Sequence, residues 1–262
     1  MALALAVLLW LMTLAIVVAF AGKFWWFPVL VSQHGAAMDS QFVFSIILCA
    51  AIFIPAQMGL GYLIFRFRDR GERARYSHGN NTLEALWIAA TAIFFLGMNL
   101  MGQGLWAQMQ FRGAAPGAMQ IEVTGKQFAW NMRYPGPDGK FGRLDPKLVS
   151  DSTGNPLGLD LQDAAAKDDV VLPTMAVPVN RPVELILRSQ DVTHAFFVRE
   201  LRLKQDAVPG MLIRVHFVAI RPGKYEIACA ELCGLGHYKM RSFLEVLPEQ
   251  DFEKWLKEQA AQ

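Results

Sequence analysis

Three long stretches without a charged side chain dominate the first half of the sequence and restrict it to a membrane-anchored fold. They cover residues 1–22, 40–65 and 85–111. A helix rises about 1.5 Å per residue, so about 20 apolar residues cross a hydrocarbon core of about 30 Å. We therefore predict three transmembrane helices, near residues 2–22, 41–65 and 84–111, within an anchor of residues 1–112. The 53% share of hydrophobic residues in the chain agrees with such an anchor.

A cleaved signal peptide is the alternative for the first apolar stretch. A signal peptide begins with a basic region, but the first cation of this chain is Lys23, which follows the apolar residues. Trp25, Trp26 and Phe27 come next and are typical of an aromatic belt at the membrane surface. We expect a retained helix, and cleavage remains the competing interpretation.

The segment between the second and third apolar stretches is rich in arginine. It holds five arginines against two acidic residues: Arg66, Arg68, Arg70, Arg73 and Arg75, with Asp69 and Glu72. Such a segment stays on the cytoplasmic side under the positive-inside rule. We therefore predict a multi-pass protein of a bacterial-type inner (plasma) membrane, in contact with lipid, whose residues 113–262 lie on the periplasmic, outer face.

Glu84 stands at the expected cytoplasmic start of the third helix. A carboxylate is favoured there by the helix dipole, with Thr82 or Asn81 as the N-cap residue. An ionisable group near membrane depth is also a candidate for a proton path. The residue types alone leave both interpretations open.

Residues 113–262 have the composition and periodicity of an external β domain. They carry 18 Lys and Arg against 19 Asp and Glu, so we expect no nucleic-acid partner. Short alternating segments near 119–124, 126–134, 183–188, 211–218, 225–228 and 242–246 predict strands of a sandwich or Greek-key barrel. Residues 135–169 are rich in Gly, Pro, Asp and Ser and predict a long surface loop. Residues 249–262 predict a closing helix.

One segment near the C-terminus concentrates soft metal ligands. Residues 229–240 contain two thiols, an imidazole and a thioether: Cys229, Cys233, His237 and Met240. These ligand types suit copper better than magnesium or calcium. A single blue-copper site uses one thiolate, so two thiolates favour a pair of metals that also needs a second imidazole. His194 is the candidate for it, while a disulfide between the two cysteines is the alternative.

Several motifs together resemble the copper A subunit, subunit II, of cytochrome c oxidase. The principal one is Cys-x-Glu-x-Cys-x3-His-x2-Met, with an upstream Asp-Val-x-His that ends at His194. Further matches are residues 201–210, with Lys204-Gln-Asp206 and Pro209-Gly210, the Gly125-Lys-Gln127 segment, and Glu84-x-x-Trp87. The resemblance covers the second and third predicted membrane helices and nearly all of the external domain.

The resemblance implies a membrane-anchored, cupredoxin-like Greek-key β-barrel with a dinuclear copper A centre. Cys229 and Cys233 would bridge the coppers, His194 and His237 would be terminal ligands, and Met240 a weak ligand. Glu231 would ligate copper through its backbone carbonyl and direct its carboxylate to a Mg²⁺ shared with subunit I. Electrons would pass from cytochrome c to haem in subunit I, where O₂ is reduced to water with proton translocation, and subunit III would be a further partner.

Other family positions extend the implied site. Glu84 matches the residue through which protons enter the K-type channel, and Asp206 matches a contact with subunit I. The family usually has Trp-x-Trp after Gly-x-Gln, and its first indole accepts the electron. This chain has Phe128 and Trp130 there, beside Asp191 as the third docking candidate. Because Phe128 has no indole, we expect an unusual donor, a haem held by a partner complex instead of a freely diffusing basic cytochrome c.

Three other protein classes share part of this pattern. Nitrous oxide reductase has the same copper site, but usually with Trp where Glu231 stands, and needs a large catalytic domain that residues 1–262 do not contain. Quinol oxidase subunits have lost the copper ligands, whereas all are present here. A membrane-tethered copper chaperone would be thioredoxin-like, with alternating helices and strands, and would not need Met240.

Overall fold

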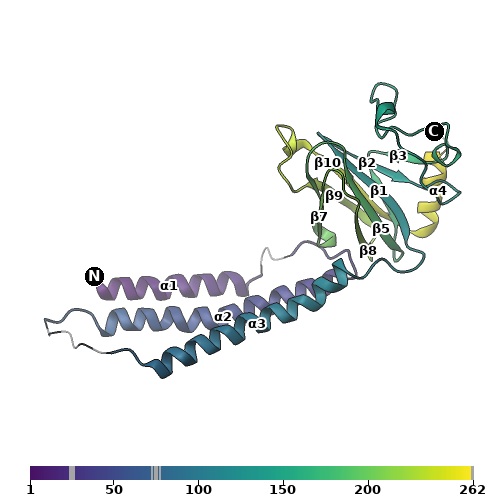
Figure 1. The fold of residues 1–262 in the computed structure, drawn as a ribbon. Helices are drawn as coiled ribbons and strands as arrows, with labels where there is room; N and C mark the ends of the chain where they lie inside the picture. The colour runs from purple at the N-terminus through teal and green to yellow at the C-terminus, as the bar shows by residue number, and fades with distance from the viewer. Residues whose placement is uncertain (24–26, 72, 74–75, 77, 261–262) are drawn as a thin grey trace. The chain divides into compact units, whose positions relative to one another are not determined.

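The computed structural model describes residues 1–23, 27–71, 73, 76 and 78–260 and contains two compact units (Figure 1). The first unit comprises Met1–Phe27 and Ala37–Trp106, and the second comprises Pro28–Ala36 and Ala107–Gln262. Trp25 and Trp26 of the predicted aromatic belt, and Glu72 and Arg75 of the arginine-rich segment, lie outside the described residues.

Three helices form the first unit, and each is long and apolar enough to cross a membrane. They are α1 (Ala2–Ala21), α2 (Gly35–Arg66) and α3 (Asn81–Gln110). The N-cap of α3 corrects the sequence-based expectation of Thr82 or Asn81. The side-chain oxygen of Asn80 accepts hydrogen bonds from the backbone N–H groups of Thr82, at 3.0 Å, and Leu83, at 3.1 Å. Asn80 is therefore the N-cap residue. From its position directly before the helix, its side-chain oxygen reaches two N–H groups of the first turn that have no partner within the helix.

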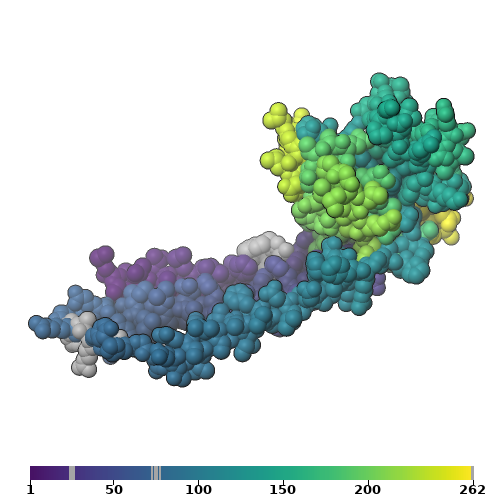
Figure 2. Space-filling model, in the orientation of Figure 1, coloured from purple at the N-terminus to yellow at the C-terminus, as the bar shows by residue number. Residues whose placement is uncertain are grey.

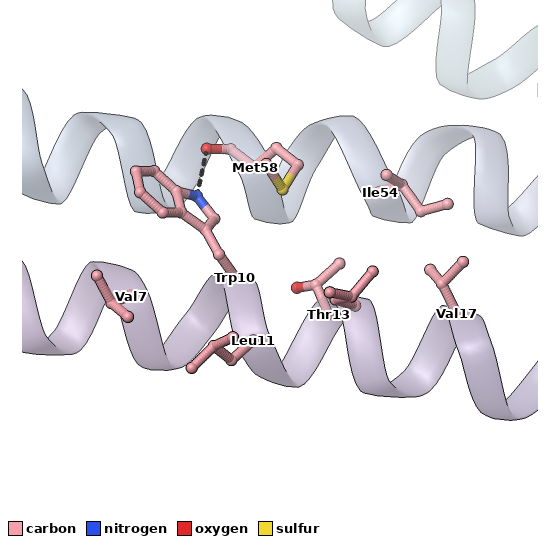
Figure 3. Close-up of a pocket in the computed structure, with 8 residues that line it drawn as sticks. Val7, Trp10, Leu11, Thr13, Val17, Ile54 and Met58 are labelled. Atoms are coloured by element: carbon pink, nitrogen blue, oxygen red, sulfur yellow. Dashed lines mark hydrogen bonds between the residues drawn. The ribbon is translucent and has the colours of Figure 1, made fainter.

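Helices α1 and α2 are joined by a hydrogen bond in an otherwise apolar contact. The indole N–H of Trp10 donates to the backbone oxygen of Met58 at 3.2 Å (Figure 3). Gly61 permits this approach, since a Cβ atom at that position would lie 2.3 Å from Trp10 Nε1. The side chains of both helices, including Trp10 and Met58, line an apolar pocket of about 380 Å³.

The second unit is an all-β domain of two five-stranded sheets. One sheet has the order β3-β2-β1-β5-β8: Val170–Leu172, Ala129–Tyr134, Met119–Lys126, Pro182–Ser189 and Ile213–Val218. The other has the order β4-β10-β9-β6-β7: Met175–Pro178, Arg241–Leu247, Gly223–Cys229, His194–Val198 and Leu203–Ala207. Helix α4 (Glu249–Ala260) follows the last strand. The predicted fold class, apolar helices followed by an all-β domain, is confirmed.

The hydrophobic core lies between the two sheets because alternate side chains of each strand point inward. Its largest fully buried members include Trp130, Tyr134, Phe196 and Phe217. Helix α4 closes one edge through Phe252, which is buried, and Trp255, whose ring centroid lies 5.6 Å from that of Tyr134. The core therefore fixes the strand ends from which the site residues extend.

The segment that leads into α2 belongs to the β domain. Val31 is fully buried in the core, its N–H donates to Glu200 O at 3.0 Å, and its carbonyl accepts from Ile220 N–H at 2.7 Å. Ser32 forms an isolated bridge with Ala219. The sequence-based division placed residues 28–36 with the membrane anchor. The packing places them with the barrel, because Val31 completes its core.

Residues 135–169 form an ordered insertion between β2 and β3. It contains two short 3₁₀ helices, η1 (Pro146–Leu148) and η2 (Ala164–Ala166). Its base is held by Arg133, whose buried guanidinium donates to Asp169 Oδ2, to Glu122 Oε2 at 2.8 Å, and to the carbonyl of Gly142. Figure 2 shows the insertion in teal-green, projecting from the surface of this unit.

Candidate metal centre

The loop from Cys229 to Met240 is closed at its base by the β9–β10 pair. Cys229 ends β9, Met240 precedes β10, and the Cys229 N–H donates to Met240 O at 3.1 Å. Inside the loop, the N–H of His237 donates to Gly234 O at 3.1 Å, and His237 begins the 3₁₀ helix η4 (His237–Lys239). Gly234 has φ +131°, a backbone conformation that favours glycine. The loop therefore turns back on itself and brings its ligands together.

His194 reaches the loop through sheet pairing. It is the first residue of β6, and in the adjacent register Phe196 pairs with Cys229. The N–H of Ala230 donates to Ala195 O at 3.0 Å. His194 and Cys229 are separated by 35 positions in the sequence. The intervening chain forms β7 and β8 and then returns as β9, which pairs with β6. Tertiary pairing thus supplies the second imidazole.

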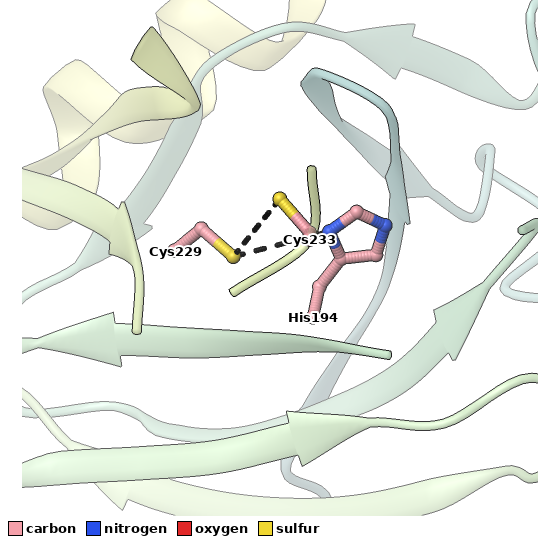
Figure 4. A group of neighbouring side chains, drawn as sticks. All are labelled: His194, Cys229 and Cys233. Carbon is pink, nitrogen blue, oxygen red and sulfur yellow. Dashed lines mark hydrogen bonds between the residues drawn. The ribbon is translucent and has the colours of Figure 1, made fainter. Parts of the chain in front are cut away.

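The five candidate side chains converge around two sulfur atoms. The Sγ atoms of Cys229 and Cys233 are 3.8 Å apart, His194 Nδ1 lies 3.9 Å from Cys229 Sγ, and His237 Nδ1 lies 3.5 Å from Cys233 Sγ. Met240 Sδ is 3.7 Å from Cys233 Sγ. The Cys229 thiol also approaches Glu231 O at 3.2 Å. Figure 4 shows the two cysteines and His194 pointing toward one another. Both cysteines are free, and a disulfide would need a sulfur separation of about 2.05 Å.

The ligand cage is largely shielded from solvent. Cys229, Cys233, Met240 and His194 are buried, while His237 is partly exposed. Burial raises the pKa of the Cys233 thiol to about 11, and the adjacent Cys229 adds to the increase. A metal that binds here must therefore displace at least the Cys233 proton. This donor set of two thiols, two imidazoles, a thioether and a carbonyl fits a pair of copper ions, and no hard-ion site would use it.

Asp191 and Gln127 connect the three loops that surround the cage. Asp191 accepts hydrogen bonds from His194 Nε2 at 2.8 Å, from Gln127 N–H at 2.7 Å and from Val192 N–H at 2.7 Å. The side-chain amide of Gln127 donates to Cys233 O at 2.5 Å. Burial raises the pKa of Asp191, but these hydrogen bonds outweigh burial, so its pKa lies below the usual value. The His194 bond leaves Nδ1 free to face the sulfurs.

Two aromatic residues lie beside the ligands at different depths. Trp130 is 2% exposed, and its ring centroid lies 5.9 Å from that of His194 in an edge-to-face arrangement. Phe128 is 39% exposed and packs on the loop backbone. A Cβ at Gly236 would lie 2.4 Å from Phe128 Cδ2, so Gly236 is needed for this contact. Phe128 is therefore the surface aromatic residue and Trp130 the interior one.

The side chains of the other predicted residues, Glu231, Asp206 and Glu84, lie outside the cage, to which Glu231 contributes only its carbonyl. Glu231 is exposed on the loop, and Asp206 lies on β7, where its carboxylate pairs with Lys204 Nζ at 3.0 Å. Glu84 lies in the first turn of α3, within the helical unit. Sequence reasoning assigned no role to Gln127, although its position directly after Gly125-Lys126 was visible as part of a motif.

Comparisons with known proteins agree with this architecture. Residues 119–247 match the family described as cytochrome C oxidase subunit II, periplasmic domain. The chain is 34% identical over 238 residues to an alternative cytochrome c oxidase subunit 2 of Bradyrhizobium diazoefficiens, covering 90% of this chain and 84% of that protein. It is 29% identical to cytochrome c oxidase subunit 2 of Cereibacter sphaeroides, with 82% and 73% covered.

A solved structure of the periplasmic domain of cytochrome oxidase subunit II (CoxB) of Bradyrhizobium japonicum also aligns. The TM-score is 0.41 at 30% identity, and the alignment covers 55% of this chain and 95% of that one. The family match and the relatives, together with the apolar helices and the Cys/His cluster, indicate a membrane-anchored subunit with a cupredoxin-like periplasmic domain. By its 34% identity across 90% of its length, the chain belongs to the cytochrome c oxidase subunit II family.

Proposed function

We propose that this chain holds a dinuclear copper A centre and passes electrons from a c-type cytochrome to haem in subunit I. One observation carries the proposal: the ligand atoms of His194, Cys229 and Cys233 lie within 4.8 Å of one another, and the two histidines each approach a different cysteine sulfur. In this assignment Cys229 and Cys233 would hold both coppers, His194 and His237 would supply the imidazole ligands, and Met240 and the Glu231 carbonyl would be weak ligands.

Copper bound in this way supplies a one-electron carrier shared over two metal ions. The protein's part is to keep the ligands still while the charge changes. Strands β6, β9 and β10 hold the ends of the ligand segments, and Asp191 fixes the orientation of the His194 ring. A cage that is fixed before the electron arrives needs little rearrangement afterwards, because its dipoles are already oriented.

Electron acceptance is assigned to the surface over Phe128, with Asp191 beside it. Phe128 packs directly on the loop that carries His237, and the buried Trp130 lies against His194. The loop also exposes Leu232, Leu235 and Tyr238. A mainly apolar surface docks a partner with little dependence on salt. We therefore favour a donor haem held by a partner complex over a freely diffusing basic cytochrome c.

The electron's destination is haem in subunit I, where O₂ is reduced to water with proton translocation. Asp206 is assigned to the contact with subunit I, and subunit III is a further partner. The exposed carboxylate of Glu231 would supply an oxygen ligand to a Mg²⁺ at that contact, since Mg²⁺ takes oxygen ligands. Glu84, in the first turn of α3, is assigned to proton uptake from the cytoplasmic side of a bacterial inner membrane.

The alternative function, a thioredoxin-like copper chaperone, is disfavoured by the all-β domain. Metal analysis distinguishes this alternative from the copper A function. The purified oxidase complex should contain two copper ions per copy of this chain in addition to the copper of subunit I. It should be purple and show a mixed-valence, two-copper spin signal. Cys233→Ser should abolish that signal, whereas Cys49→Ser, in α2, should preserve it. A single exchangeable Cu(I) would exclude the copper A assignment.

Docking is tested separately by the salt dependence of turnover. If the donor is held in a partner complex, turnover with that complex should change little between low and high ionic strength. A steep fall with salt, measured with soluble cytochrome c at native concentrations, would identify a basic diffusing donor instead.

A further inference from the structure

Two contacts join the tip of the 135–169 insertion to the turns beside the ligand cage. The Lys126 ammonium forms an ion pair with the carboxylate of Asp151. The side-chain amide of Gln190 donates to the carbonyl of Pro156 at 2.9 Å. Lys126 and Gln190 immediately precede Gln127 and Asp191, the two residues that hydrogen-bond the ligand segments. The insertion therefore touches the chain one residue away from each of them.

The tip of the insertion is itself closed by hydrogen bonds. Ser150 and Asn155 exchange backbone hydrogen bonds, each of 2.9 Å. The side chain of Asn155 accepts from Leu159 N–H at 2.7 Å and donates to Leu159 O at 3.0 Å. Asp151 and Pro156 thus stand on a short hairpin whose shape does not depend on the metal loop.

The base of the insertion is anchored independently in the barrel. Asp169 accepts from Gly142 N–H at 2.9 Å and pairs with the buried guanidinium of Arg133. Gly142 packs closely on η2, since a Cβ there would lie 2.2 Å from the Ala166 Cα. The insertion is thus attached to the barrel at its base by a buried ion pair and by close backbone packing, separately from the contacts at its tip.

The two turns that the hairpin contacts are already neighbours. Ser189 pairs with Gly125 in the β1–β5 register, and Gln190 N–H donates to Gly125 O at 3.0 Å. Contacts from one hairpin to both turns therefore restrain them as a unit.

From these contacts we infer that the 150–156 hairpin is a brace for the metal centre. Lys126, Asp151 and Gln190 act as positioning residues: they hold the turns that carry Gln127 and Asp191, and through these the cysteine and histidine ligands. The inference rests on the proposed copper A function and extends it to a segment outside the ligand loop. It predicts that the brace slows copper loss without contributing a ligand.

The test removes one contact by a substitution in the hairpin, at Asp151, and the other by a substitution in a turn, at Gln190. Asp151→Ala and Gln190→Ala alter exposed residues, so the fold should survive both. Copper loss from the purified oxidase complex is followed by the copper A absorption after addition of a chelator. Each substitution should accelerate loss about two- to fivefold, the range expected for an exposed ion pair or one hydrogen bond, and the double variant should lose copper faster than either single variant.

Two controls show whether the pairing itself matters. Lys126→Asp or Asp151→Lys alone places two like charges together and should accelerate copper loss. The double variant Lys126→Asp/Asp151→Lys restores an opposite-charge pair and should lose copper more slowly than either single variant. Lys224→Ala breaks an ion pair of the same type, Lys224 Nζ to Glu245 Oε1 at 2.8 Å, near the start of β9 and away from Cys229 at its end. It should leave copper loss unchanged.

A second measurement does not depend on copper. In the metal-free complex, hydrogen exchange of the Gln127 and Val192 amides, which both donate to Asp191, should be faster in the Asp151→Ala/Gln190→Ala variant. An intact copper A signal with unchanged copper loss and exchange would overturn the brace and leave the proposed function standing. A wild-type complex without a two-copper signal would overturn both.

Discussion

The imidazole of His194 donates from Nε2 to Asp191 Oδ1 at 2.8 Å, and its other nitrogen, Nδ1, lies 3.9 Å from Cys229 Sγ. Asp191 thus orients a candidate metal ligand without touching the sulfurs. Outer partners of this kind commonly change metal affinity by about 10- to 100-fold when they are removed. We expect Asp191→Ala to weaken copper retention by that amount, measured by chelator competition with the metal-loaded complex.

Asp191→Asn is the matched variant for that experiment. Its single side-chain oxygen can accept either the Gln127 N–H, which bonds Oδ2 of Asp191, or the Val192 N–H, which bonds Oδ1, and it lacks the carboxylate charge facing His194. Copper retention should be intermediate, with a shifted copper A reduction potential. Equal retention in the wild type and both variants would show that His194 does not depend on Asp191.

Phe128 and Gly236 form a size-matched pair. A Cβ at Gly236 would lie 2.4 Å from Phe128 Cδ2, so Gly236→Ala should force the ring or the loop to move. Overpacking of this kind costs about 1–3 kcal/mol. The melting temperature of the copper-loaded domain should fall, and the double variant Phe128→Ala/Gly236→Ala should recover part of the loss. No recovery would place the strain elsewhere in the loop.

Metal loading should release protons. The pKa of Cys233 is raised to about 11, first by burial and then by Cys229, so this thiol is protonated at neutral pH in the metal-free protein. Copper must displace that proton, and the apparent affinity should increase at least about tenfold per pH unit between pH 6 and 8. Proton release measured on a pH-stat, with Cys233→Ser as the comparison, checks this expectation. An affinity independent of pH would contradict it.

Val31 should stabilise the barrel although it precedes the second membrane helix. Its side chain is fully buried in the β-domain core, whereas Val29, two residues earlier, is 49% exposed. Val31→Ala removes two buried methyl groups and should lower the free energy of unfolding by about 2 kcal/mol. Val29→Ala is the control and should have little effect. Thermal unfolding of the complex, followed through the copper A absorption, compares the two.

Glu84 allows a functional test that spares the copper centre. If it takes up protons, Glu84→Gln should slow steady-state O₂ reduction while the copper A signal and its reduction rate by the donor remain unchanged. The matched variant Thr82→Ala alters the same helix turn but no ionisable group. Equal slowing in both variants would indicate a structural role at the start of α3.

The sequence alone determined the three apolar helices, the all-β class of the external domain and the set of soft ligands. These features are readable because they are local: the length of a charge-free stretch, strand periodicity, and four ligand side chains within residues 229–240. Strands β3 and β4 escaped prediction because three or four residues carry little periodic signal. Strands β6 and β7 escaped it because their five residues do not alternate cleanly between buried and exposed.

Only the tertiary structure decided how these parts support one another. Strand pairing brings His194 beside Cys229, Asp191 and Gln127 tie three separate loops together, and Val31 fills a core formed by residues far along the chain. Each of these relationships depends on contacts between residues that are distant in the sequence. A distance of 2.7 Å between the Gln127 amide and the Asp191 carboxylate, 64 residues apart, is set by sheet register, which no local pattern encodes.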